Sequence, residues 1–201
     1  MAHLSQDLAV IADMVLPGTR VLDVGCGDGA LLEHLARTKN VDGRGVELSQ
    51  AGVNACVARG LSVVQGDADS DLADYPTGAF DYVILGQTIQ ATRYPRTVLQ
   101  QMVRIGRHGI VSLPNFAHWR MRTSLLGRGR MPVTRALPNA WYDTPNIHMC
   151  SVRDFSELAQ ELKLTIDRVV SLRGGKPHAV KPFSISANLF AEQAIFLLRG
   201  A

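Results

Sequence analysis

The sequence predicts an α/β domain with a mostly parallel sheet that is covered by helices on both faces. Short apolar segments alternate along the chain with segments whose apolar residues recur at helical spacing. Residues 80–85 are apolar at nearly every position, which is typical of a strand buried on both faces of a parallel sheet. A glycine-rich turn follows the first expected strand, where α/β folds pass from a strand into a helix.

In the first half of the chain the expected elements follow one another with short connections. Apolar residues at helical spacing predict helices near residues 4–15 and 31–36, and Pro17-Gly18 ends the first of them. Ser49 is expected to cap another helix, because its side chain can accept a hydrogen bond from the first turn. The strands expected here are residues 20–24, 43–48, 61–65 and 80–85.

The second half adds two helices and completes the sheet. One helix is expected near residues 98–105, and Ser151 with Asp154 has the spacing of a capping box that begins another. The strands expected here are residues 108–113, 165–172 and 188–198, with a loop at 174–182 between the last two. The expected sheet therefore has seven strands and ends in a strand pair.

Length and composition place limits on the class of protein. The 201 residues, of which 46% are hydrophobic, fit a single domain over residues 1–201. No apolar run approaches the length of a membrane-spanning helix, and polar residues interrupt the N-terminal segment where a signal peptide would be apolar. Cys26, Cys56 and Cys150 lie far apart, without zinc-ligand spacing. We therefore expect a cytoplasmic protein with reduced, buried thiols and no metal site.

Residues 21–29, Val-Leu-Asp-Val-Gly-Cys-Gly-Asp-Gly, carry the first functional signal. Gly25, Gly27 and Gly29 let backbone N–H groups approach a ligand closely, because no Cβ intervenes. Glu47 lies twenty residues after Gly27, at the tip of the next expected strand, where a carboxylate can accept both hydroxyls of a ribose. The spacing indicates a nucleoside pocket, and a tight turn that binds no ligand is the alternative.

The charges around the glycines distinguish between nucleoside ligands. A dinucleotide site has the spacing G-x-G-x-x-G, whereas here the third glycine comes one residue earlier. Asp23 and Asp28 flank the turn, and two acids favour a positively charged ligand over a pyrophosphate. Asp-x-Gly-x-Gly-x-Gly with a downstream acid resembles motif I of the class I S-adenosylmethionine (AdoMet) methyltransferases, whose seven-stranded sheet is Rossmann-like and has an antiparallel last strand.

That resemblance implies a role for further residues. The glycine loop would hold the methionyl part of AdoMet or of its product S-adenosylhomocysteine, with Asp23 near the ammonium group and Glu47 at the ribose. Leu48 directly follows Glu47, and we expect it to contact the cofactor as well. Asp67-Ala68 follows the third strand, where the family has an acid against the adenine amino group, and a helix cap for residues 69–74 is the alternative. Gly86-Gln87 ends the fourth strand at the same edge.

The methyl acceptor is not indicated by the residues after the fourth strand. Amine methyltransferases carry Asn/Asp-Pro-Pro-Tyr/Phe there, whereas this chain has Gly-Gln-Thr-Ile-Gln at residues 86–90. Methyl transfer depends mainly on in-line positioning of the nucleophile, so the missing motif does not exclude it. His118, Tyr142 and His148 are candidate bases, each with a structural role as its alternative, and no catalytic residue is assigned.

Basic residues are concentrated in the middle of the chain. Residues 1–81 hold twelve acids and five bases, whereas residues 82–142 hold nine arginines, no lysine and no acid. An inserted segment at residues 116–150 overlaps this stretch and contains two tryptophans. A long insertion in a compact domain is usually functional, and arginine with tryptophan is typical of a protein interface. A solvated helical face and an aromatic lid over the pocket are the alternatives.

Three phrases of the inserted segment carry a more specific resemblance. They are Pro-Asn-Phe-Ala-His-Trp-Arg at residues 114–120, Gly-Arg-Met-Pro-Val-Thr at 129–134 and Trp-Tyr-Asp-Thr-Pro-Asn-Ile-His at 141–148. Together with residues 21–29, they closely resemble the MetW family of methionine-biosynthesis proteins, over roughly residues 20–198. The resemblance implies a methyltransferase-like fold. It also implies a place beside homoserine O-acyltransferase, the α/β-hydrolase enzyme that such proteins accompany and activate.

Two functions therefore follow from the sequence. The first is an AdoMet-binding, non-catalytic partner of homoserine O-acyltransferase that docks through residues 116–150. The second is an AdoMet-dependent methyltransferase acting on a small metabolite, whose anionic group the arginines would hold. Nucleic-acid binding is not expected, because no recognition motif or lysine-containing basic stripe accompanies the arginines.

Overall fold

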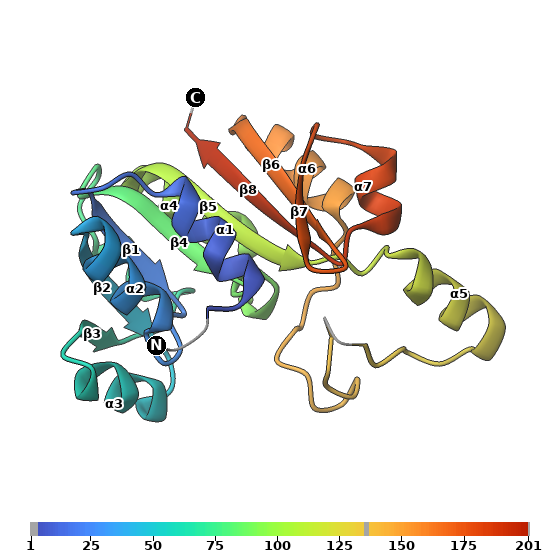
Figure 1. The fold of residues 1–201 in the computed structure, drawn as a ribbon, viewed down its shortest axis with the longest axis horizontal. Helices are drawn as coiled ribbons and strands as arrows, with labels where there is room; N and C mark the ends of the chain where they lie inside the picture. The colour runs from blue at the N-terminus through green and yellow to red at the C-terminus, as the bar shows by residue number, and fades with distance from the viewer. Residues whose placement is uncertain (1–3, 135–136, 201) are drawn as a thin grey trace.

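The computed structural model describes residues 4–134 and 137–200 of the chain. Within them, eight strands form one sheet in the order β3-β2-β1-β4-β5-β8-β6-β7 (Figure 1). The strands are β1 (Arg20–Val24), β2 (Asp42–Glu47), β3 (Ser62–Gln65), β4 (Phe80–Gly86), β5 (Gly106–Pro114), β6 (Thr165–Arg173), β7 (Lys176–Val180) and β8 (Gln193–Arg199). Strands β1 to β5 pair in parallel, and β8 pairs antiparallel with both β5 and β6. The expected α/β, Rossmann-like sheet with an antiparallel last strand is confirmed.

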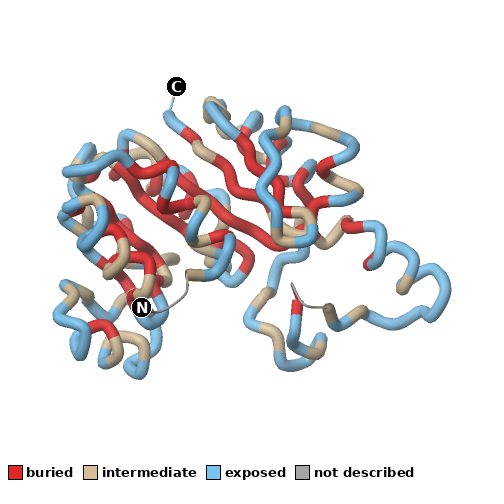
Figure 2. The backbone as a smooth tube through the Cα atoms, in the orientation of Figure 1, coloured by how far each residue is buried: buried red, intermediate tan, exposed pale blue. Residues whose placement is uncertain are grey.

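Helices cover both faces of this sheet. On one face, α1 (Gln6–Met14) and α2 (Ala30–Lys39) pack against the central strands, and α3 (Gln50–Ala58) packs beside α2 through Cys56. The other face carries α4 (Pro95–Ile105), α6 (Val152–Glu161) and α7 (Ile185–Phe190), together with the 3-10 helices η1 (Asp71–Asp74) and η2 (Ile89–Ala91). Figure 2 shows that the most deeply buried backbone runs through the central strands. The residues of β4 from Tyr82 to Leu85 are all buried, as the apolar run predicts.

The predicted helix starts are confirmed by their capping hydrogen bonds. The Ser49 hydroxyl accepts a hydrogen bond from the Gly52 N–H at 3.1 Å. At α6, the Ser151 hydroxyl accepts from the Asp154 N–H at 3.1 Å, and the Asp154 carboxylate accepts from the Ser151 N–H at 2.8 Å. These two bonds form the reciprocal capping box expected from the spacing.

The prediction of seven strands was wrong at the C-terminal end. Residues expected as a loop after β6 instead form β7, and Gly174-Gly175 makes the two-residue turn with φ of 51° and 77°. Two glycines suit such a hairpin, and Pro177 in β7 is tolerated because β7 is an edge strand. Residues 188–190, expected to begin the last strand, belong to α7, whose first turn is capped by Ser184. The last strand therefore begins only at Gln193.

The described helices are short relative to a lipid bilayer. None of them in residues 4–134 or 137–200 is long and apolar enough to cross a membrane.

Candidate functional site

The loop between β1 and α2 contains three glycines with left-handed backbone angles. Gly25, Gly27 and Gly29 have φ values of 76°, 59° and 78°, which strain any other residue. A Cβ at Gly25 would overlap the side chain of Thr88, and a Cβ at Gly29 would overlap that of Leu61. At Gly27 the described atoms leave open space within 4 Å. The loop therefore needs glycine for its shape, and at Gly27 it presents bare backbone to solvent.

Glu47 reaches this loop from the neighbouring strand. β2 lies parallel to β1, so both strands end at the same edge of the sheet. Glu47 Oε2 accepts a hydrogen bond from the Gly27 N–H at 2.9 Å, and Oε1 accepts one from the Ser49 N–H at 2.9 Å. Each oxygen keeps a second lone pair, so Glu47 retains acceptor capacity for a hydroxyl. Leu48, directly after it, is 65% exposed.

Asp23, one residue before the end of β1, is only 3% exposed. Burial, and then the negative charge of Glu47, raise the pKa of Asp23 to about 7. No described residue donates a hydrogen bond to its carboxylate. Ionising Asp23 is costly without a cation beside it, and a bound cation would favour the ionised form.

A cavity of about 310 Å³, here called the rim cavity, opens where β1 and β4 end. Part of the residue set predicted from the sequence lines this cavity. The predicted residues in its lining are Asp23, Gly25, Gly27, Gly86 and Gln87. Those outside its lining are Gly29, Glu47, Leu48, Asp67 and Ala68.

α1 contributes a residue to the rim cavity that sequence reasoning missed. Asp7 is 4% exposed, and its Oδ2 accepts a hydrogen bond from Gln87 Nε2 at 2.6 Å. Gln87 has a φ of 57°, and its backbone N–H donates to Ser112 Oγ at 3.0 Å. Asp7 lies four residues before Ile11 on the buried face of α1. An acid on the apolar face of an expected helix was the signal that could have found it.

Asp28 differs from the other acids at the rim cavity, because it has a cationic partner. Its Oδ2 lies 2.6 Å from the Arg59 guanidinium, which also contacts Glu33 Oε2 at 2.7 Å. Asp23 and Asp7 have no such partner among the described residues.

The loop after β3 is organised by its own acids. Asp67 is exposed; its Oδ1 accepts a hydrogen bond from the Asp69 N–H at 2.9 Å, and its carbonyl accepts one from the first residue of η1. Asp69 in turn accepts from the backbone N–H groups of Arg93 and Tyr94 at 2.7 and 2.9 Å. Asp67 thus shapes the turn before η1, but its carboxylate does not cap this helix, whose N-cap is Ser70. Ala68 between the two acids packs against the core.

The cysteines near the glycine loop are free thiols. Cys26 and Cys56 are buried, with their sulfur atoms 3.9 Å apart. Burial raises the pKa of both thiols, which keeps them protonated. Cys150, expected to be buried, is only half-buried.

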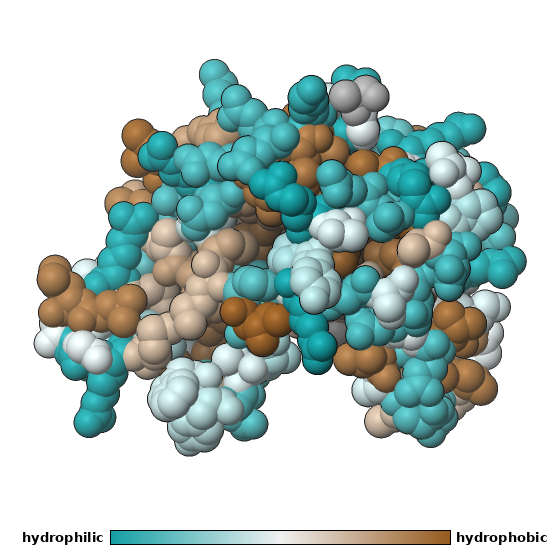
Figure 3. Space-filling view, turned by 180° about the vertical axis from the view of Figure 1, so that it is seen from behind, coloured by the Kyte–Doolittle hydropathy of each residue, from teal (hydrophilic) through white to brown (hydrophobic). Residues whose placement is uncertain are grey.

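Residues 116–150 project away from the sheet as α5 (Trp119–Arg128) followed by an extended segment (Figure 1). Residues 135–136 of this insertion lie outside the described part. Its two ends are joined where the Phe116 N–H donates to the Cys150 carbonyl at 3.2 Å. Figure 3 shows hydrophobic side chains gathered on α5, at the left of the view. The exposed large apolar side chains of the described insertion are Trp119, Leu125, Leu126, Met131, Val133, Trp141, Tyr142, Ile147 and Met149.

The described part of the insertion lies apart from the rim cavity. No described residue of 116–150 lines it, so the aromatic-lid alternative has no support in this arrangement. His118 caps α5, because its Nδ1 accepts a hydrogen bond from the Arg120 N–H at 3.2 Å, and burial lowers the pKa of this histidine. Tyr142 and His148 are exposed. None of these three candidate bases lines the cavity.

One residue joins the insertion to the segment after β4. The Gln90 carbonyl accepts hydrogen bonds from the Ile147 and His148 N–H groups at 2.9 and 3.0 Å. Gln90 is 1% exposed, and its Nε2 donates to the Pro114 carbonyl at 3.1 Å. It lies three residues after Gln87. The backbone that borders the rim cavity therefore also holds the end of the insertion.

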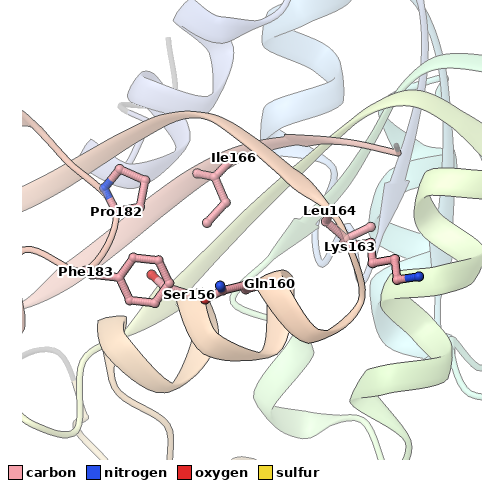
Figure 4. A pocket seen from close by; sticks show the side chains of 7 residues that line it. All are labelled: Ser156, Gln160, Lys163, Leu164, Ile166, Pro182 and Phe183. Carbon is pink, nitrogen blue, oxygen red and sulfur yellow. The ribbon is translucent and has the colours of Figure 1, made fainter.

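A second cavity, of about 370 Å³, lies between α6 and the turn before α7 (Figure 4). None of the site residues predicted from the sequence is found in its described lining. It is lined by Ser156, Gln160, Lys163, Leu164, Ile166, Pro182 and Phe183.

Similarity to known proteins identifies the family of this chain. A family model of the methionine biosynthesis protein MetW matches residues 5–198. The chain belongs to the MetW family. It is 32% identical over 201 residues to a bifunctional methionine biosynthesis protein MetXA/MetW of Rhodopirellula baltica, covering 96% of this chain and 32% of that protein. The chain thus spans about a third of the length of this relative.

Other relatives place the MetW-family chain among methyltransferase-like proteins. A ubiquinone biosynthesis O-methyltransferase of Hahella chejuensis is 27% identical over 190 residues, covering 83% of this chain and 78% of that protein. The fold is shared with a SAM-dependent methyltransferase of Thermotoga maritima, at a TM-score of 0.70 and 16% identity over 98% and 88% of the two chains. The [4+2]-cyclase SpnF has the fold too, at a TM-score of 0.67 and 16% identity over 96% and 80%. This is a methyltransferase-like protein of methionine biosynthesis, and its fold alone does not decide its chemistry.

Proposed function

We propose that this MetW-family protein binds AdoMet or S-adenosylhomocysteine at the carboxyl ends of β1, β2, β3 and β4. The observation that carries the proposal is the hydrogen bond from the Gly27 N–H to Glu47, which closes an acidic, glycine-rich rim beside Asp23, an acid without a cationic partner among the described residues. The proposed contact residues are Asp23, Gly25, Gly27, Gly29, Glu47, Leu48, Asp67, Ala68, Gly86 and Gln87.

The charges of this rim favour a sulfonium nucleoside over a dinucleotide. The lining of the rim cavity includes Asp7 and Asp23, which have no cationic partner among the described residues and would repel a pyrophosphate and attract a cation. Glu47 has free lone pairs for ribose hydroxyls, and the exposed Leu48 offers an apolar surface to the nucleoside. The open side of Gly27 allows backbone and ligand to approach closely.

Calorimetric titration with AdoMet and S-adenosylhomocysteine tests this proposal. We expect wild-type protein to bind both and Glu47→Ala to lose about 100-fold or more, because two charge-assisted hydrogen bonds and the support of Gly27 are removed together. Glu157→Ala, which removes an exposed carboxylate on α6, is the matched control and should bind normally. Wild-type protein that ignores both nucleosides, or prefers a dinucleotide, would contradict the proposal.

We further propose that the protein serves methionine biosynthesis as a cytoplasmic partner and activator of homoserine O-acyltransferase. Membership of the MetW family supports this role, and so does the Rhodopirellula baltica relative, which combines MetXA and MetW in one bifunctional protein. The insertion at residues 116–150 is the proposed docking surface, because it combines exposed tryptophans with arginines. A bound nucleoside regulates the acyltransferase only if it binds the free and complexed protein with different affinity.

Homoserine acylation measured with and without this protein, across a titration of AdoMet, tests the partner role. We expect acylation to rise when the protein is added, and the complex to weaken in Trp119→Ala and Arg120→Ala. Ile185→Ala removes an apolar side chain that is 82% exposed on α7, outside the insertion, and should leave the complex intact. An acyltransferase that neither co-purifies with the protein nor responds to it would exclude this role.

Methyl transfer to a small metabolite is the second candidate function. The curated relatives named as methyltransferases favour it, such as that of Hahella chejuensis. In this case the arginines of residues 82–142 would hold an anionic acceptor. Incubation of a cell extract with AdoMet carrying a labelled methyl group tests it directly. A labelled small molecule that appears only with the wild-type protein supports this function, and label confined to AdoMet argues against it.

A further inference from the structure

The rim cavity has an acidic lining whose charge is only partly compensated. The described lining contains the carboxylates of Asp7, Asp23 and Asp28 but no lysine, arginine or histidine. Asp28 is paired with Arg59 at 2.6 Å, whereas neither Asp7 nor Asp23 has a cationic partner among the described residues. Buried carboxylates are normally paired, so two of them beside one cavity call for a positive group from a ligand.

Asp7 and Asp23 reach the cavity from different elements and keep unused acceptor capacity. Asp7 comes from α1 and is 4% exposed, and Asp23 comes from β1 and is 3% exposed. Among the described residues, Asp7 receives one side-chain hydrogen bond, from the neutral amide of Gln87, and Asp23 receives none. An ionised carboxylate can accept about four hydrogen bonds, and an ammonium group has three donors to give.

We infer that Asp7 is a ligand-binding residue, which together with Asp23 forms a two-carboxylate site for the α-ammonium group at the amino-acid end of an AdoMet-type nucleoside. The inference rests on the nucleoside site proposed above and adds a residue of α1 to it. The first residues of α2, Ala30 and Leu31, line the same cavity. The positive end of the α2 dipole suits the carboxylate of the same amino-acid group. Asp7 thereby distinguishes nucleosides that carry an amino-acid end from those that lack one.

Two ligands and two variants test this inference by calorimetry. S-adenosylhomocysteine carries the amino-acid end, whereas 5′-methylthioadenosine has the same nucleoside and thioether without it. We expect Asp7→Asn to weaken S-adenosylhomocysteine about 10- to 100-fold, the range for a hydrogen bond to a charged group. The affinity for 5′-methylthioadenosine should stay within about twofold, because the lost charge faces no part of that ligand. Asp13→Asn, an exposed position on the same helix, is the matched control and should change neither affinity.

The outcomes separate this inference from the proposal on which it rests. An Asp7→Asn variant that binds 5′-methylthioadenosine normally has an intact fold, so its loss of S-adenosylhomocysteine would locate the effect at the ammonium group. If the variant loses both ligands equally, or keeps full affinity for S-adenosylhomocysteine, Asp7 is no ammonium site, and the nucleoside proposal stands. A wild-type protein that binds neither ligand would overturn both.

Discussion

The rim at the ends of β1, β2 and β4 and the insertion at residues 116–150 are built in opposite ways. At the rim, Asp7 and Asp23 are buried, Asp28 is paired with Arg59, and Glu47 is fixed by hydrogen bonds from the backbone N–H groups of Gly27 and Ser49. In the insertion, large apolar side chains face solvent, and the segment is held mainly at its ends. A site whose groups are fixed in advance suits a small ligand, whereas exposed aromatic and apolar side chains suit a partner large enough to bury them.

The largest expected effect on stability comes from adding one methyl group to a glycine, and it should differ between the two regions. Gly25→Ala should destabilise the protein by about 2–4 kcal/mol and abolish nucleoside binding, because the added Cβ overlaps Thr88 at a left-handed φ of 76°. Gly129→Ala at the end of α5 has a similar φ of 60° but open space around the Cβ, and should cost only about 1–2 kcal/mol. Urea unfolding of both variants makes the comparison, and equal costs would mean that the rim is no more tightly packed than the insertion.

A substitution in the insertion should give the reverse pattern. Trp141 is 72% exposed, so Trp141→Ala should change the free energy of unfolding by less than about 0.5 kcal/mol. The same change should weaken the complex with homoserine O-acyltransferase by about tenfold or more, if the ring is an interface anchor. Thermal unfolding and a binding titration on one preparation measure both quantities. A stable variant with full affinity would remove Trp141 from the docking surface.

A smaller effect, of up to about tenfold per pH unit, is expected from Asp23. Its folded-state pKa is about 7, raised from 3.8, so without ligand its contribution to stability falls as the pH rises from about 4 to about 7. Nucleoside binding should have the opposite slope, because the ligand ammonium favours ionised Asp23. Affinity for S-adenosylhomocysteine should therefore increase as the pH rises through 7.

Calorimetry between pH 6 and pH 8 measures this slope. The other acids near the site, Asp7, Asp28 and Glu47, are present in both the wild-type protein and Asp23→Asn, so the variant is a direct control. It should bind more weakly at pH 8 and lose most of the slope. If the affinity of Asp23→Asn depends on pH as steeply as that of the wild-type protein, another group is responsible for the pH dependence.

Much of the rim could be predicted because parallel strands end at one edge of a sheet. The twenty-residue spacing is enough to bring Glu47 to Gly27, since their strands are neighbours in parallel register. Asp7 could not be found in this way, because α1 reaches the cavity by packing across the sheet and not through strand order. The position of Asp7 depends on tertiary packing. A single acid on an apolar helix face indicates that the acid is buried, but not which elements pack around it.

The errors at the C-terminal end have a different cause. Residues 188–190, Asn-Leu-Phe, are as compatible with a short helix as with the start of a strand, and Ser184 as the cap decides for the helix. β7 was missed because Lys176-Pro177 has little strand character, although Gly174-Gly175 is a hairpin signal. The composition of the insertion indicated an exposed, aromatic segment. It did not indicate how the end of the insertion is attached to the rest of the domain.

The insertion is attached at the Gln90 carbonyl, and this attachment connects it to the rim. Any rearrangement of residues 86–90 around a nucleoside would move the carbonyl to which Ile147 and His148 are hydrogen-bonded. In the same way, a protein bound to the insertion would affect residues 86–90 through these two hydrogen bonds. If homoserine O-acyltransferase binds the insertion as proposed, thermodynamic reciprocity requires it to change the affinity for the nucleoside by the same factor by which the nucleoside changes the affinity for the acyltransferase. With positive coupling, the proposed complex would also bind the nucleoside more tightly than the free protein does.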